Sequence, residues 1–228
     1  MNYQDATSIV AVRPLDALLA AFAAGRLSEA FAVLVAAHLE LNTASRAFVA
    51  DLEIAGGIQL EEIEPVPLNN RDRQLASIFA KPAEAQRVWC GRNWDIAADA
   101  ADELVPPALR AYAGCEFDEL EWDTVVPGLQ RCTIASDRNG EASLMRCRAG
   151  KRMPWHRHDG LEAVLVLQGG LGDGAGHYVR GEIAIADEAL VHRPVADPNE
   201  ECIYFVAREG TVHYLAPVGD TAPPLANY

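Results

Sequence analysis

The sequence predicts an α+β protein of two domains, in which a small bundle of helices precedes a half built from short antiparallel strands. Apolar residues recur at helical spacing through about the first 80 positions. From Val125 onward, short β-prone runs alternate with Gly, Asp and Asn turns. With 228 residues, half of them apolar, the chain can bury two modest cores.

The expected boundaries follow changes in composition. We expect a helical domain at residues 1–81, an acidic linker at 82–123 and the β domain at 124–228. The linker region holds ten Asp and Glu residues against three Arg, and Pro106-Pro107 interrupts any long periodicity. We therefore expect it to be extended and to wrap onto the second domain.

Four helices are predicted in the first domain: Leu15 to about Gly25, Ser28 to about Asn42, Ser45 towards Gly56-Gly57, and Asn70 towards Pro82. Ser28 is expected to cap the second helix. Their shared core should contain Leu15, Leu18, Phe22, Phe31, Leu34, Val35, Phe48 and Leu52.

Six β-prone runs follow: Leu129–Ile134, Ala142–Cys147, Ala163–Leu167, Glu182–Ile185, Cys202–Ala207 and Val212–Ala216. The segment Asp137-Arg138-Asn139-Gly140 is typical of a hairpin turn. Many short strands at this spacing indicate a barrel or a sandwich.

Charge and cysteine content exclude several classes of protein. The 33 acidic and 19 basic side chains give a formal charge of −14, which disfavours direct binding to nucleic acid. Five cysteines without a short paired spacing argue against a disulfide framework. Residues 1–12 lack an export signal, and no run of about 18 apolar residues occurs, so we expect a cytoplasmic protein without a membrane segment.

A cluster of metal-ligand residue types lies in the β domain. His156 and His158 are two apart, so on a strand they face the same way. Asp159-Gly160 can turn the chain and bring Glu162 beside them, and His192 follows a later β-prone run. Three imidazoles and a carboxylate favour zinc, iron, manganese, nickel or copper over calcium or magnesium. We predict one transition-metal ion held by His156, His158, Glu162 and His192.

The spacing around these residues resembles the first cupin motif. Gly150, five residues, His156, one residue, His158, three residues, Glu162, six residues and Gly169 match every fixed position of that motif. The second motif matches in part, because Asp187-Glu188-Ala189 replaces its usual Pro-x-Gly. The resemblance implies a double-stranded antiparallel β-barrel, the jelly roll.

The amino-acid sequences of two segments, 162–169 and 181–196, resemble the cupin of ChrR-type anti-sigma factors. Segments 15–25 and 28–41 resemble the first two helices of that family. The resemblance implies that the helical domain binds an extracytoplasmic-function (ECF) sigma factor, while a zinc-binding cupin responds to oxidative stress. A small-molecule ligand in the cupin pocket and a homodimer are left open.

The chain departs from this family at a second zinc site. Relatives hold zinc with a His near the N-terminus, a His late in the second helix and a following Cys-x-x-Cys. Here Arg13 stands about where the first His belongs, His38 keeps the second position, and Asn42 and Ser45 replace the cysteines. An amide and a hydroxyl cannot replace thiolates, so we expect no zinc in the helical domain and a hydrogen-bonded core role for His38.

Two other functions remain as alternatives to a non-enzymatic regulator. Related cupins include metal-dependent dioxygenases that cleave diketones, and others only bind a small molecule. No catalytic residue is assigned. His177 and His213 lack partners at ligand spacing and receive no role.

Overall fold

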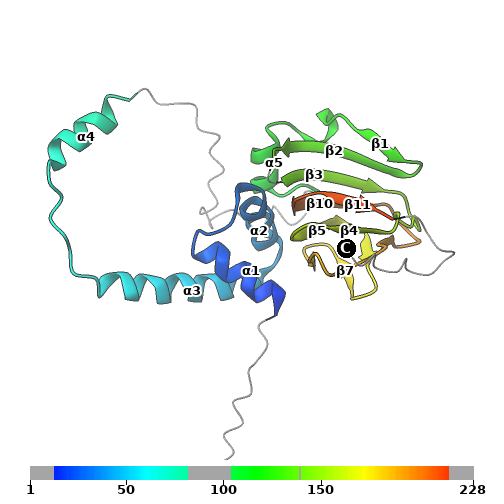
Figure 1. Ribbon diagram of the computed structural model, residues 1–228, viewed down its shortest axis with the longest axis horizontal. Helices are drawn as coiled ribbons and strands as arrows, with labels where there is room; N and C mark the ends of the chain where they lie inside the picture. Colours follow the sequence, from blue (N-terminus) through cyan, green and yellow to red (C-terminus); the bar gives the residue numbers. More distant parts are fainter. Residues whose placement is uncertain (1–12, 82–103, 139, 216–228) are drawn as a thin grey trace, which may run out of the picture.

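Helices occupy the first part of the chain and strands the second (Figure 1). The computed structural model describes residues 13–81, 104–138 and 140–215. The helices are α1 (Pro14–Ala23), α2 (Glu29–Leu41), α3 (Thr43–Glu61), α4 (Arg71–Phe79) and α5 (Pro107–Ala113), followed by the short 3-10 helix η2 (Phe117–Glu119). The four predicted N-terminal helices are thus confirmed.

Two local expectations about these helices are wrong. The third helix does not stop at Gly56-Gly57 but continues to Glu61, because both glycines have ordinary negative φ angles and nothing packs beside them to impose a turn. Two glycines in a helix only weaken it, by about 1 kcal/mol each relative to alanine. Ser28 does occupy the N-cap of α2, but its side chain makes no capping hydrogen bond.

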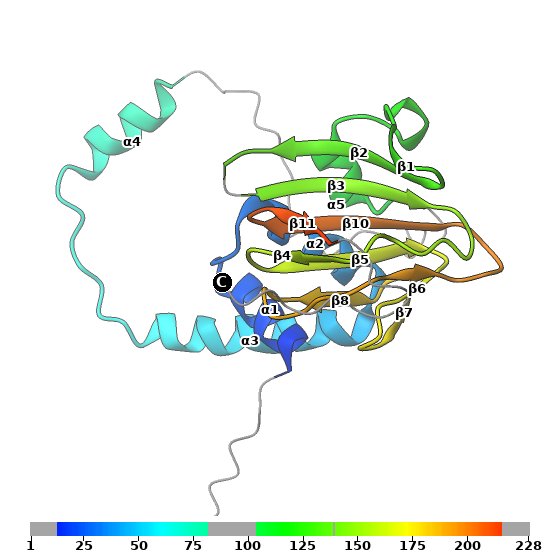
Figure 2. The ribbon, with the colours of Figure 1, turned by 45° about the vertical axis from the view of Figure 1, so that its right-hand side comes forward.

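Eleven strands form the antiparallel C-terminal half, which confirms the predicted cupin fold: β1 (Asp123–Val126), β2 (Leu129–Ser136), β3 (Gly140–Cys147), β4 (His156–His158), β5 (Glu162–Gln168), β6 (Gly170–Gly172), β7 (His177–Val179), β8 (Ile183–Ala186), β9 (Val195–Ala196), β10 (Cys202–Glu209) and β11 (Val212–Tyr214). Six of them make one sheet in the order β1-β2-β3-β10-β5-β8 (Figure 2), and the remaining strands form the pair β11-β4 and the three-stranded sheet β7-β6-β9. The hairpin between β2 and β3 turns at Asp137, whose carboxylate accepts a hydrogen bond from the Gly140 backbone at 3.1 Å, as predicted. The predicted end of the last strand, Ala216, lies outside the described residues.

The six-stranded sheet is covered on both faces. Alternate residues of a strand point to opposite sides. On β5, Leu165 and Leu167 pack under the helices. Val164 and Val166 pack inside the barrel. This is why β5 is apolar at nearly every position instead of alternating with polar residues.

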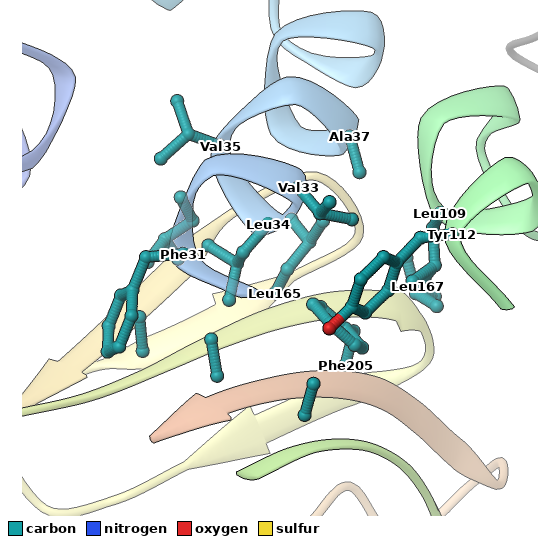
Figure 3. Packing of buried hydrophobic residues seen from close by; sticks show 14 of the residues in the cluster. Phe31, Val33, Leu34, Val35, Ala37, Leu109, Tyr112, Leu165, Leu167 and Phe205 are labelled. Atoms are coloured by element: carbon teal, nitrogen blue, oxygen red, sulfur yellow. The ribbon is translucent and has the colours of Figure 1, made fainter. Parts of the chain in front are cut away.

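Helix α2 packs against the sheet as well as against other helices. Leu34 lies on the side of α2 that faces Leu165 and Phe205, whereas Val35 lies on the opposite side (Figure 3). Every residue from Phe31 to Leu39 is buried. The helices therefore share one core with the cupin. The sequence instead predicts that they form a core of their own.

Part of the segment expected to be an extended linker is helical and buried. Leu109 and Tyr112 of α5 enter the same core, and Tyr112 meets the ring of Phe205 edge to face at 6.5 Å. The carboxylate of Glu40 on α2 accepts hydrogen bonds from the Ala108 backbone at 3.2 Å. Residues 82–103 of this segment lie outside the described part of the chain.

The end of α3 and all of α4 behave differently. They extend away from the cupin in both views (Figures 1 and 2). Phe48, expected in the core, is 38% exposed. Nine further apolar side chains from Ile54 to Phe79 are at least 37% exposed: Ile54, Ile58, Leu60, Ile63, Val66, Leu68, Leu75, Ile78 and Phe79. We call these nine residues the apolar arm.

None of the described helices is both long enough and apolar enough to cross a lipid bilayer.

Candidate metal centre

The four predicted ligands come from three separate segments. His156 and His158 lie at the two ends of β4, Glu162 begins β5, and His192 follows β8. A backbone bridge joins the strands directly: the amide of His156 donates to the carbonyl of His192 at 3.1 Å, and the reverse bond measures 3.0 Å. The bridge places His192 opposite the first imidazole although 36 positions of sequence separate them.

The side chains of these residues converge inside the barrel. Their ligand atoms all lie within 4.8 Å of one another. The ring centroids of His156 and His192 are 4.4 Å apart, and both rings are about 5.0 Å from His158. A carboxylate oxygen of Glu162 lies 3.1 Å from Nε2 of His158 and the other lies 3.9 Å from Nε2 of His192. All four residues are buried.

The protonation states suit ligation. Burial lowers the pKa of His156, and burial together with the neighbouring imidazole of His156 lowers the pKa of His192 to about 4. Burial alone would raise the pKa of Glu162, but its three histidine neighbours outweigh that effect and lower it. Near neutral pH, His156 and His192 are therefore neutral and Glu162 is a carboxylate, the forms that bind metal.

One ligand is oriented by the backbone. Nδ1 of His156 lies 2.8 Å from the carbonyl of Pro154, so this nitrogen donates and Nε2 presents its lone pair to the site. Backbone carbonyls commonly orient metal-binding imidazoles in this way.

The donor set has the character of a metal site. Apart from the Glu162 carboxylate, which lies 3.1 Å from Nε2 of His158, neither imidazole of His158 and His192 has a hydrogen-bond partner within the described residues. Leaving buried imidazole nitrogens unsatisfied costs free energy, and a cation that accepts one lone pair from each ring removes that cost for the coordinating nitrogen. The four residues could therefore hold one metal ion.

His38 lies in a different environment. Its ring is buried, and Nδ1 is 2.7 Å from the carbonyl of Gly181, in the turn before β8. The predicted role of a hydrogen-bonded core residue is confirmed. His38 thus ties the end of α2 to the cupin.

The two residues that replace the family's cysteines form a helix cap. Asn42 precedes α3, and its side-chain oxygen accepts a hydrogen bond from the amide of Ser45 at 3.0 Å. Arg13 pairs instead with Asp16 through two contacts of 2.9 Å. That no zinc binds among these residues stays a prediction.

His177 and His213 are separate from the centre. His177 lies 2.9 Å from Asp197, and His213 lies 2.7 Å from Asp159, both at the surface. Among the cysteines, Cys132, Cys147 and Cys202 are buried and Cys115 is partly exposed, while Cys90 lies outside the described residues.

Three charged residues beside the centre were missed by the sequence analysis. Arg131, Glu141 and Arg208, from β2, β3 and β10, line the same cavity as the proposed ligands His156, Glu162 and His192. These residues lie far apart in the sequence, and only the pairing of β3 with β2 and with β10 brings them together. Strand alternation alone shows that Glu141 and Ser143 share a face, but it does not show that the face is the cavity.

Comparison with known proteins agrees with the geometry. Residues 110–212 match the family model described as the ChrR cupin-like domain. The anti-sigma-E factor ChrR of Cereibacter sphaeroides is 35% identical over 206 residues, which cover 87% of this chain and 90% of that protein. The crystal structure of Rhodobacter sphaeroides SigE in complex with the anti-sigma ChrR contains a chain with the same identity that superposes with a TM-score of 0.66 over 84% of this chain and 95% of that one.

Proposed function

The chain belongs to the family of ChrR-type anti-sigma factors, and from this premise we propose that it is a non-enzymatic regulator of transcription that binds an ECF sigma factor and carries one metal ion in its cupin. The similarity covers the helices as well as the cupin, so it applies to the part of the chain that would grip a sigma factor. The proposal places the protein in the cytoplasm, where sigma factors meet RNA polymerase.

The observation that carries the proposal is the apolar arm. Soluble proteins rarely expose large contiguous apolar surfaces unless a partner covers them. The residues of the arm lie on the end of α3, on the connection to α4 and on α4, which has no buried residue. An amphipathic helix that lacks a core of its own is suited to dock into an apolar groove of a partner.

We propose zinc as the metal, with iron, manganese or nickel as alternatives. Three imidazoles and a carboxylate suit all four ions, and zinc is the ion that the family resemblance implies. His156, His158, Glu162 and His192 would bind it. In this proposal residues 1–81 bind the sigma factor, and the cupin at 124–228 senses the signal that ends binding, for which oxidative stress is the candidate.

Co-purification from the source organism tests the partner. The full-length protein should retain a sigma factor, and Ile58→Asp or Ile78→Asp should abolish retention, because a buried unpaired carboxylate opposes docking. Gln59→Asp is the matched control, since it adds the same charge to an exposed position next to Ile58. Retention that survives both Ile variants, or a wild-type protein that retains no sigma factor, would contradict the proposal.

The dioxygenase alternative has less support. The relative that matches this chain from the helices through the cupin is an anti-sigma factor, and an enzyme would have no need of the apolar arm. Oxygen consumption with a diketone by the iron-loaded protein would revive it.

A further inference from the structure

The metal centre forms only part of a cavity inside the barrel. The cavity has a volume of about 70 Å³. This is room for roughly five water-sized groups. Apolar side chains make much of its lining, including Leu129, Met145, Val164 and Val206. The space suits a small molecule with a short carbon skeleton.

One wall of the cavity carries an excess of positive charge. Arg208 donates to Glu141 at 3.1 Å, and Arg131 reaches the same carboxylate at 3.5 Å. The hydroxyl of Ser143 donates to Glu141 as well, at 2.5 Å. Two guanidinium groups thus share one carboxylate. The Nε nitrogens of both arginines have no hydrogen-bond partner within the described residues.

This wall lies next to the metal centre. Arg208 on β10 is the cross-strand partner of Glu141 on β3 and, on its other side, of the proposed ligand Glu162 on β5. Directly paired residues of neighbouring strands have Cβ atoms about 5 Å apart and point to the same face. Arg208 therefore stands between its carboxylate partner and the metal ligand, with a side chain only 14% exposed.

The remaining acidic group of the cavity already has hydrogen-bond donors. Asp173 lies on the lining, but its carboxylate accepts two hydrogen bonds of 2.9 Å from the backbone amides of Ala175 and Gly176. With a divalent ion bound, the cavity as a whole carries positive charge in surroundings where water screens it poorly.

We propose that this cavity binds a small organic carboxylate, attracted jointly by the metal ion and by Arg208 and Arg131. The inference rests on the proposed metal centre. Guanidinium groups match the planar geometry of a carboxylate with paired hydrogen bonds. The apolar lining favours a short hydrocarbon body over a fully hydrated inorganic anion such as phosphate.

Binding measurements on the full-length, zinc-loaded protein test this inference. Acetate, propionate and butyrate are compared by calorimetry and thermal shift with acetamide, propionamide and butyramide, which keep the shape and remove the charge. Inorganic phosphate serves as the hydrated anion. We expect the carboxylates to bind and stabilise the protein, and the amides and phosphate to bind at least tenfold more weakly.

Variants then locate the site. Arg208→Gln should weaken carboxylate binding by roughly tenfold to a hundredfold, as loss of a charged hydrogen bond does, while the zinc content stays unchanged. Arg131→Gln provides a second test if Arg208→Gln does not fold. Arg146→Gln is the matched control, because Arg146 also lies on the sheet but pairs with Glu201 outside the cavity.

The outcomes separate this inference from the proposed metal centre. A protein that carries zinc but does not prefer carboxylates, or whose folded arginine variants bind as the wild type does, contradicts the inference and leaves the metal centre intact. A protein that carries no zinc contradicts the metal centre. If it still prefers carboxylates and loses that preference in Arg208→Gln, the arginine site stands without the ion.

Discussion

The cupin centre and the surroundings of His38 show how the same buried side chain acquires different roles. In the cupin, three imidazoles and a carboxylate converge, and within the described residues the only polar side chains close to His158 and His192 belong to this group. In α2, a single imidazole meets a backbone carbonyl at 2.7 Å, and the next residues form a helix cap. Burial alone does not distinguish a ligand from a structural histidine, whereas convergence of donors does.

Removal of a cupin ligand should have the largest effect. Glu162→Gln or His158→Ala deletes one of four donors, so bound metal should fall from about one ion per chain to near zero. Metal analysis of protein purified without chelators measures it. His213→Ala, which alters a surface pair, is the control and should keep its metal. If the wild-type protein carries no metal, the claim that the cupin histidines are ligands and His38 is not would be contradicted.

Removal of His38 should lower stability and leave the metal in place. His38→Ala leaves the Gly181 carbonyl without its partner and opens a cavity in the shared core, which should lower the free energy of unfolding by about 2–4 kcal/mol. Urea denaturation of variant and wild type measures the loss. His38→Gln, which can still donate a hydrogen bond, should lose less. A second bound ion that disappears with His38→Ala would show that both environments bind metal.

Acid should reveal His38 through its proton. Burial lowers the pKa of His38 below its ordinary value of 6.5, so the unfolded state binds this proton more readily than the folded state. Stability is therefore full above about pH 6.5 and decreases as the pH falls below it. Between pH 7.5 and 5.5, the wild type should lose about 1 kcal/mol more than His38→Gln. Denaturant titrations at the two pH values measure these losses of stability. If the wild type and His38→Gln lose the same free energy of unfolding, His38 does not contribute to the pH dependence of stability.

The cap at Asn42 should have the smallest effect. Asn42→Ala removes the acceptor for the Ser45 amide and should cost about 0.5–1 kcal/mol. Asn42→Asp keeps the acceptor and should be close to the wild type in thermal unfolding. A loss beyond 2 kcal/mol would indicate that Asn42 holds more than the start of α3.

The sequence predicted the cupin centre well because its cues are local. His156 and His158 share a strand face, and the turn at Asp159-Gly160 returns Glu162 to them, so three of the four donors depend on a dozen neighbouring residues. His192 was included because it follows a later β-prone run, but only the backbone bridge to His156 shows how it comes close. Metal binding by these four residues stays a prediction.

The features that were missed depend on distant contacts. No periodicity in α2 indicates that the side carrying Leu34 meets strands β5 and β10 of the sheet, and the burial of Leu109 in α5 has the same cause. Likewise, the sequence alone shows Arg208 only as a charged residue near the end of an apolar strand. Its position between Glu141 and Glu162 follows from strand pairing alone.

The core that α2 shares with the cupin also affects the order of events during synthesis. Phe31 to Leu39 leave the ribosome long before Leu165 and Phe205, the residues that cover them. At roughly 5–20 residues per second, that interval is on the order of ten seconds. During it, the nascent helices lack their apolar cover and depend on chaperones or transient packing. We therefore expect the grip on a sigma factor to mature only when the last long strand, β10, has been made, so that a prematurely terminated chain would silence no promoter.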